Sequence, residues 1–230
     1  MTDKQTGLDF SMVIASTVHD MKNSLTTVMQ THAQWRERLD DAQRNPPECG
    51  VIDYEFARLN GMMVQLLGLY KLGIDQLPLR PDYHEMDDFI EAQLALHQEV
   101  LSGRGITASY DVDDFCPLGF FDRELLGSLV ANIMINAIRF ARSAIHISVR
   151  EEEGQLLLTI NDDGPGYRPE LLTLQPDFVQ GIDAVSGSTG LGLYFASQIA
   201  ARHQRNSVQG RIELTNGGDL GGGCFILYLP

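Results

Sequence analysis

The sequence predicts an α+β fold, in which an antiparallel helical hairpin forms a dimeric four-helix bundle with a second copy and precedes an α/β sandwich domain. Two observations carry this prediction. Apolar residues recur in steps of four and three along the first part of the chain, which is the pattern of a coiled coil or helical bundle. After the segment Gly73 to Pro81, which contains two prolines, helix and strand patterns alternate, as expected for helices layered on a mixed sheet.

The first predicted helix covers residues 8 to 43, which contain no proline. Asn45-Pro46-Pro47 ends this helix, and Gly50 contributes to the turn that follows. A second helix completes the hairpin, and because one hairpin cannot bury both apolar seams alone, we expect a homodimer. The first seam is Ile14, Val18, Met21, Leu25, Val28, Trp35 and Leu39, with His32 between Val28 and Trp35, and the second is Ile52, Phe56, Leu59, Met63, Leu66 and Tyr70.

The second domain is predicted from alternating patterns. The expected helices are 86–101, 122–142 with Asp122 as N-cap, and 191–203, and the expected strands are 106–112, 145–150, 156–160, 212–214 and 225–229. Gly154 marks the turn between the second and third of these strands. We therefore divide the chain into a hairpin domain at 1–75, a linker at 76–84 and a second domain at 85–230.

Composition excludes several classes of protein. The net charge of −14 argues against nucleic acid as a partner, because a phosphate backbone requires clustered Lys and Arg. Three scattered cysteines fit neither a metal site nor a disulfide framework, which indicates a reducing cytoplasmic location. No apolar run is long enough to span a membrane, and the first ten residues lack the features of a signal peptide.

A carboxylate next to a glycine-rich turn follows one predicted strand. Asp162 precedes Gly164-Pro165-Gly166. A carboxylate there can accept a hydrogen bond from an exocyclic amine, and glycines let the backbone approach a flat ring. An ordinary acidic turn is the alternative, because Asp-Gly and Pro-Gly are common turn dipeptides.

A second glycine-rich run, Gly187 to Leu193, leads into the helix at 191–203. Such a run presents backbone N–H groups and a helix N-terminus to an anion. It lacks the Lys-Ser/Thr ending of a P-loop, so it would be a different phosphate cradle, or else a flexible loop before a helix.

Three polar residues share one face of the helix at 122–142. Asn132 and Asn136 lie one turn apart, and Arg139 lies three residues further on. The amides can hold Mg²⁺ directly or through water, and Arg139 can meet a phosphate. A solvent-facing polar stripe is the alternative, although two asparagines are poor helix formers in so apolar a segment.

Together these motifs resemble the N, G1 and G2 boxes of the ATP-binding domain shared by sensor histidine kinases, gyrase, Hsp90 and MutL, over residues 82 to 230. The resemblance implies that Asp162 binds the adenine amine, that the turn glycines Gly164 and Gly166 belong to the same nucleotide site, and that Asn136 coordinates Mg²⁺. Phosphates would meet Arg139, and Asn132 would lie on the same nucleotide-facing side. The backbone of Thr189, Gly190, Leu191 and Gly192 would complete the phosphate site.

Two further positions follow from the resemblance. A lid from Tyr167 to Ser186 would order on ATP binding, with Phe178 as its loosely matched phenylalanine. The ATPases of the superfamily carry a catalytic Glu where this chain has Asn132. Because an amide cannot take a proton from water at neutral pH, we expect little hydrolysis and transfer of the γ-phosphoryl to another group.

The acceptor is predicted at His19. A neutral imidazole is a nucleophile toward the γ-phosphorus, and the adjacent carboxylate of Asp20 can accept the proton of the ring. The segment His19-Asp20-Met21-Lys22-Asn23 resembles the H-box of histidine kinases, within a likeness covering residues 8 to 73. By that resemblance Asn23 orients water for phosphatase action. Many members carry Glu, Arg and Pro where this chain has Asp20, Lys22 and Ser24, and the missing proline weakens the expected kink.

The other five histidines lack this arrangement. His32 lies in the seam itself and is predicted to be a buried polar layer. His203 is predicted to cap the helix at 191–203 or to lie on the surface. His84, His97 and His146 have no neighbouring carboxylate and Asn in this pattern.

The sequence therefore predicts an ATP- and Mg²⁺-dependent protein-histidine kinase that phosphorylates His19 and transfers the group to an aspartate of a response regulator receiver domain. A separate protein would sense the signal in trans, or the chain would be the core of a longer kinase. The alternatives are a histidine phosphotransferase module that has lost ATP binding, and a stand-alone ATPase or clamp.

Overall fold

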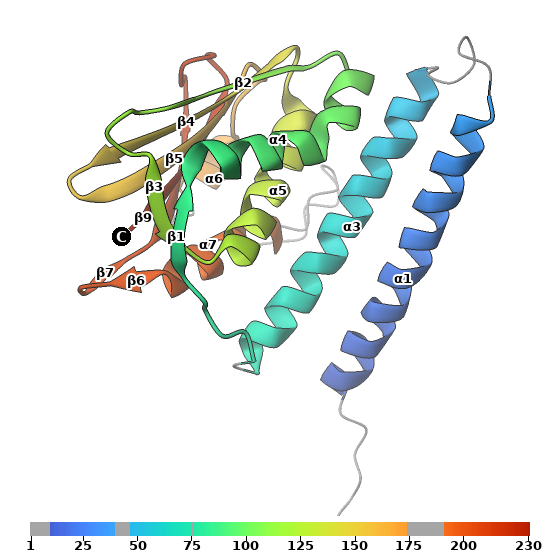
Figure 1. Cartoon of the computed structure of the whole chain (residues 1–230), viewed down its shortest axis with the longest axis horizontal. Coiled ribbons are helices and arrows are strands. Elements are labelled where there is room, and N and C mark those ends of the chain that lie inside the picture. The colour runs from blue at the N-terminus through green and yellow to red at the C-terminus, as the bar shows by residue number, and fades with distance from the viewer. Residues whose placement is uncertain (1–9, 40–46, 75, 174–190) are drawn as a thin grey trace, which may run out of the picture.

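The computed structural model describes residues 10–39, 47–74, 76–173 and 191–230. It begins with two long antiparallel helices, α1 (Phe10–Glu37) and α3 (Pro47–Gly73), which pack against each other (Figure 1). The predicted hairpin is therefore confirmed. Its first helix ends at Glu37, earlier than expected, and residues 40–46 lie outside the described part of the chain.

The role predicted for Gly50 is wrong. Gly50 does not form the turn but lies inside α3, which begins at Pro47. Proline suits the first position of a helix because the N–H that it lacks has no partner there. A Cβ on Gly50 would lie 2.7 Å from the carbonyl oxygen of Gly103, the last residue of helix α4 (Met86–Gly103), so this glycine serves a close helix–helix approach instead.

The second domain is a five-stranded mixed sheet covered by helices, in the order β2-β4-β5-β9-β8. The β2–β4 pair is parallel and the other pairs are antiparallel. The elements are α4 (Met86–Gly103), β2 (Thr107–Val112), α5 (Arg123–Phe140), β4 (Ala144–Glu152), β5 (Gln155–Asp162), α6 (Pro169–Thr173), α7 (Leu191–Arg202), β8 (Arg211–Asn216) and β9 (Gly223–Leu229). Helices α4, α5 and α7 lie between the sheet and α3 (Figure 1).

All helices and strands predicted for this domain are present. Asp122 caps α5, because its carboxylate accepts hydrogen bonds from the backbone N–H groups of Glu124 and Leu125. The β4–β5 hairpin turns at Glu153-Gly154, where both residues have positive φ.

Two short strand pairs were not predicted. β1 (Asp82–Glu85) pairs with β3 (Leu118–Phe121), and β6 (Gln204–Arg205) pairs with β7 (Val208–Gln209). The first three residues of β1, 82–84, fall inside the expected linker at 76–84. Strands of two to four residues are too short to show a periodic pattern.

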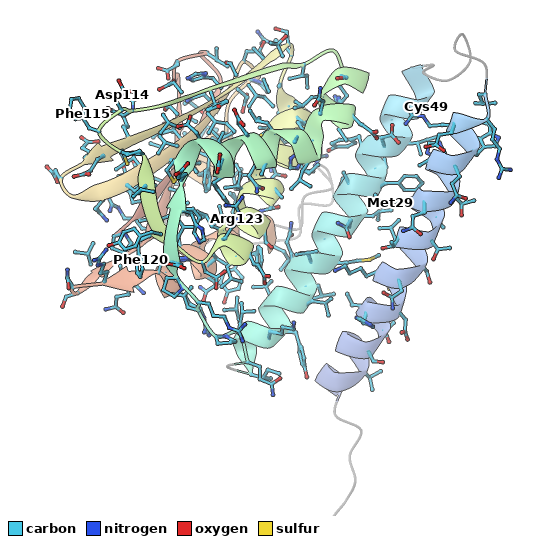
Figure 2. The ribbon with its side chains drawn as sticks, in the orientation of Figure 1. Met29, Cys49, Asp114, Phe115, Phe120 and Arg123 are labelled. Carbon is cyan, nitrogen blue, oxygen red and sulfur yellow. The ribbon has the colours of Figure 1, made fainter. Side chains whose placement is uncertain are left out.

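The core of this domain is apolar and closely packed. Phe89, Phe121, Phe195 and Phe225 are its largest fully buried side chains. At the end of the molecule opposite α1, the side chain of Phe115 projects from the turn after β2 and is 90% exposed (Figure 2). Among the described residues, none of the helices is both long and apolar enough to cross a membrane.

Candidate functional site

The carboxylate of Asp162 lies at the end of β5 and is buried, with 7% of the residue exposed. Its Oδ1 accepts hydrogen bonds from the backbone N–H groups of Gly164, at 2.8 Å, and Gly223, at 3.3 Å. Burial raises the pKa of this carboxyl, and the two hydrogen bonds oppose that rise. Both bonds go to one oxygen, so Oδ2 remains available to an amine donor.

Glycines surround Asp162 because no side chain fits there. A Cβ on Gly223 would lie 2.8 Å from Oδ2 of Asp162, and a Cβ on Gly222 would collide with the carbonyl oxygen of Asp162. A Cβ on Gly164 would collide with the carbonyl oxygen of Phe140. Gly164, a predicted site residue, therefore forms one cradle around the carboxylate with two glycines that were not among the predicted site residues, Gly222 just before β9 and Gly223 at its start.

The loop after Asp162 is held to the turn before β9 by Asn216. The side-chain oxygen of Asn216 accepts a hydrogen bond from the backbone N–H of Tyr167, and its amide nitrogen donates to the carbonyl of Tyr167. Gly166, which directly precedes Tyr167, has φ +79°, a conformation that favours glycine. Sequence reasoning missed Asn216, because the pairing joins positions that are far apart in the chain.

Asp163 has a different environment from its neighbour. Its carboxylate accepts hydrogen bonds from the backbone N–H groups of Arg142 and Ser143 and from the hydroxyl of Ser143. Burial, the largest single effect, raises the pKa of Asp163, but the hydrogen bonds from these donors together outweigh it and hold the pKa well below its usual range. Asp163 thus fastens the α5–β4 connection, and Asp162 is the member of the pair that faces the cradle.

The three polar residues predicted on one face of α5 have separate surroundings. Asn132 is buried: its Nδ2 donates to the carbonyl of Gly192 at 2.8 Å, and its Oδ1 accepts from Nε2 of Gln65 at 2.5 Å. Asn136 and Arg139 are half-buried, and the guanidinium of Arg139 lies 5.2 Å from the ring centre of Phe140. Asn132 thus connects α5 both to the start of α7 and to α3.

The second glycine-rich run is only partly described. Leu191 and Gly192 form the first turn of α7, and a Cβ on Gly192 would lie 2.8 Å from Oδ1 of Asn132. Thr189, Gly190 and the lid phenylalanine Phe178 lie outside the described residues.

The predicted acceptor lies on α1. Val18 is buried against the hairpin, whereas the neighbouring His19 and Asp20 are exposed, and so is Asn23 one turn later. This is the arrangement expected for a nucleophile that another domain must reach. In Figure 1, α3 stands between α1 and the sheet domain.

The remaining histidines have structural environments. His32 packs against Trp35 and Phe56 in the hairpin, with Nδ1 3.7 Å from Oδ1 of Asp53, as expected for a polar group in the seam. His203 is buried, so its predicted surface location is wrong. Its Nδ1 contacts the carbonyl of Ile199 at the end of α7, in agreement with the capping alternative, and its Nε2 accepts from the backbone N–H of Asp122.

Comparison with known proteins relates these features to a family. Residues 121–230 match the family model described as Histidine kinase-, DNA gyrase B-, and HSP90-like ATPase. The sensor histidine kinase CssS of Bacillus subtilis is 30% identical over 158 residues, which are 67% of this chain and 33% of CssS. The sensor protein kinase GraS of Staphylococcus aureus is 23% identical over 194 residues, 81% of this chain and 52% of GraS. The chain thus spans a third to a half of these relatives.

Two solved structures share the fold of nearly the whole chain. Full-length ShkA in complex with AMPPNP gives a TM-score of 0.64 at 20% identity, covering 96% of this chain and 46% of ShkA. The Acinetobacter baumannii histidine kinase AdeS gives a TM-score of 0.58 at 19% identity, covering 92% of this chain and 96% of that one. The helical hairpin followed by an α/β sandwich is therefore a known arrangement.

Proposed function

Because this chain belongs to the sensor histidine kinases and contains their ATPase-like domain at residues 121–230, we propose that it autophosphorylates His19 from Mg-ATP. The observation that carries the proposal is the cradle around Asp162: a buried carboxylate with one oxygen left for a donor, enclosed by glycines that leave no room for side chains. An exposed histidine next to a carboxylate in the same chain provides an acceptor.

The described residues fit ATP and Mg²⁺. Asp162 accepts the exocyclic amine of adenine, and Gly164 and Gly166 let the backbone lie close to the base. Asn136 provides an amide oxygen for Mg²⁺, which needs few protein ligands because phosphates and waters supply the others. Bound Mg²⁺ would neutralise charge on the phosphates.

In the proposed reaction an imidazole nitrogen of His19 attacks the γ-phosphorus of ATP. A nitrogen–phosphorus bond forms, the bond from the γ-phosphorus to the bridging oxygen breaks, and ADP leaves. The carboxylate of Asp20 accepts the proton from the other ring nitrogen. Asn132 stands where hydrolytic relatives carry a Glu, so no general base is available there to activate water.

We also propose that the hairpin forms a homodimer. Met21, Val28 and Trp35 on α1 are each about half exposed, which is unusual for large apolar side chains at bundle positions. A groove of about 540 Å³ between the helices is lined by Thr27, Val28, Thr31, His32, Trp35, Ile52 and Phe56. The hairpin of a second copy would cover this surface and complete a four-helix bundle.

The proposal extends to partners and domain limits. The phosphoryl group would pass from His19 to an aspartate of a response regulator receiver domain, and Asn23 would orient water for the reverse, phosphatase reaction. The hairpin domain would be residues 1–75, the linker 76–84 and the catalytic domain 85–230. The signal would come from a separate protein acting in trans or from a sensor segment of a longer kinase. The chain itself would act in the cytoplasm.

Incubation with ATP labelled at the γ-phosphate tests the proposal. We expect an acid-labile label on the wild-type chain that His19→Gln abolishes and His32→Gln preserves, because His32 packs against Trp35 and Phe56 in the hairpin seam with only 15% of its side chain exposed. Labelling that persists in His19→Gln would contradict the assignment of the acceptor. Continuous release of phosphate without labelled protein would favour a stand-alone ATPase instead.

A further inference from the structure

Helix α3 has a second patterned face, which does not belong to the apolar seam. Residues at helical spacing along this face pack onto the ATPase-like domain: Gly50, Tyr54, Ala57, Gln65, Gly68 and Leu72. We call this set the α3 stripe. Its residues are small or polar at the points of closest approach, so the stripe fits a shaped surface and does not simply bury apolar area.

Two glycines of the stripe leave space for the domain. A Cβ on Gly50 would lie 2.7 Å from the carbonyl oxygen of Gly103 on α4, and a Cβ on Gly68 would collide with the ring of Phe195 on α7. Glycine lowers helix propensity, so its presence inside α3 has a cost that the close approach explains. Gly61 lies seven residues before Gly68 on the same helix, and a Cβ there would meet no atom within 4 Å.

The stripe reaches the face of α5 that carries the proposed phosphate-binding residues. Gln65 donates to Asn132, which in turn donates to Gly192 in the first turn of α7. Tyr54, eleven residues earlier on α3, lies near Arg139: burial raises the pKa of its phenol, and the charge of Arg139 is the first of the effects that oppose the rise. The α3 stripe therefore packs against α5, with Gln65 at Asn132 and with Tyr54 within the electrostatic influence of Arg139.

The contact between the α3 stripe and the ATPase-like domain leaves one buried polar group without a hydrogen bond. The hydroxyl oxygen of Tyr54 is buried and has no hydrogen-bond partner among the described residues. A buried polar group without a partner costs free energy, which weakens the docking of the stripe. A polar pair, Gln65 with Asn132, stands where a permanent interface would be expected to have apolar contacts. Both features suit a contact that must open.

We propose that the α3 stripe is an intramolecular competitor of the nucleotide phosphates. Docked, it occupies the face of α5 between Asn132 and Arg139; the triphosphate binds fully only when the stripe lifts. The inference rests on the proposed nucleotide site and adds a coupling that acts within one chain. By linkage, the two events must oppose each other with the same free energy, so nucleotide binding also loosens the hairpin from the domain.

Titration of the full chain with a non-hydrolysable ATP analogue and Mg²⁺ tests the competition. Gln65→Ala removes the hydrogen bond to Asn132, and Gly68→Ala forces the helix away from Phe195. We expect each variant to bind the analogue roughly fivefold more tightly than the wild type, a change of about 1 kcal/mol. The matched control, Gly61→Ala, adds the same methyl group on the same helix where nothing meets it, and should leave the affinity unchanged.

Adenosine provides the second measurement, because it lacks the phosphates for which the stripe competes. A merely structural effect on the domain would change the affinity for adenosine and for the ATP analogue alike. The proposal expects the gain for the analogue alone. Equal affinities for the analogue in the wild type, Gln65→Ala and Gly68→Ala would overturn it while leaving the nucleotide site intact. Absence of nucleotide binding in all chains would overturn both proposals.

Discussion

The carboxylate proposed to bind the nucleotide and the histidine proposed to accept its phosphoryl group lie in opposite environments. Asp162 is buried among glycines of the α/β domain, whereas His19 is exposed on α1, a helix on which Met21, Val28 and Trp35 are also about half exposed. A site that recognises a flat base must be rigid and desolvated, and a nucleophile that another domain must reach has to be accessible. Substitutions in the domain should therefore change stability and binding, and substitutions at His19 should change only the chemistry.

The largest difference in the free energy of unfolding should come from the apolar core of the α/β domain. Phe195 of α7 is 1% exposed, so Phe195→Ala should lower the free energy of unfolding by about 3–5 kcal/mol. His19→Ala on the exposed face of α1 should change it by less than about 0.5 kcal/mol. Urea unfolding of the two variants measures both values. A loss above about 1 kcal/mol in His19→Ala would contradict the view of α1 as an open surface.

The exposed residues of α1 should matter for association more than for folding. Val28 is 51% exposed in the single chain and lines the groove of the hairpin, so Val28→Lys should weaken the proposed dimer by about 2–4 kcal/mol. Light scattering across a dilution series gives the molar mass. Thr26→Lys, on the exposed surface outside the groove lining, serves as a control. A wild-type chain that is monomeric at high concentration would refute the four-helix bundle.

Asp162→Asn should separate binding from stability. An amide keeps the size of the carboxylate but loses the charge-assisted hydrogen bond to the adenine amine, so nucleotide affinity should fall roughly 10- to 100-fold. Burial raises the pKa of Asp162, so ionisation of this group disfavours the folded state at neutral pH. The variant should therefore be as stable as the wild type or more so. Calorimetric titration measures the nucleotide affinity and thermal unfolding measures the stability. An unchanged affinity would show that Asp162 does not bind the nucleotide.

The sequence predicted the elements whose periodicity is long and regular, and it predicted the cradle turn from Asp162, Gly164 and Gly166. It did not predict the α3 stripe, because a search for apolar repeats passes over glycine and glutamine. The signal was present as Gly50 and Gly68 inside one helix, eighteen residues and therefore five helical turns apart.

Contacts between distant segments explain the other omissions. Nothing in the sequence near His203 reveals that it accepts a hydrogen bond from the backbone of Asp122, 81 positions away. Similarly, Gly222 and Gly223 become part of the Asp162 cradle only because β9 pairs with β5. Pairings of this kind are set by sheet topology and not by local pattern.

His203 makes the stability of the buried domain depend on pH. Burial lowers its pKa, and its Nε2 must be unprotonated to accept from Asp122. The unfolded chain binds a proton below about pH 6.5 that the folded chain resists, so stability should fall with falling pH by up to about 1.4 kcal/mol per unit. Buried His97, whose pKa is also lowered, adds to this slope.

The contribution of His203 can be isolated with His203→Gln, whose side-chain oxygen can still accept a hydrogen bond. Unfolding free energies between pH 7 and pH 5.5 should show a shallower slope in this variant than in the wild type, by about one proton. His19→Gln is the control from the exposed helix. Identical slopes in the wild type and His203→Gln would show that His203 does not resist protonation.

The smallest predicted effect on stability is at the β4–β5 turn. Glu153 has φ +52° and Gly154 has φ +76°, the conformation of a two-residue type I′ turn, for which Asn-Gly is the preferred sequence. Glutamate pays a steric cost in this region that asparagine partly avoids. Glu153→Asn should therefore stabilise the domain by about 0.5 kcal/mol in thermal unfolding, with no change in nucleotide affinity or in labelling of His19. A destabilised variant would show that Glu153 makes a favourable contact that outweighs its backbone strain.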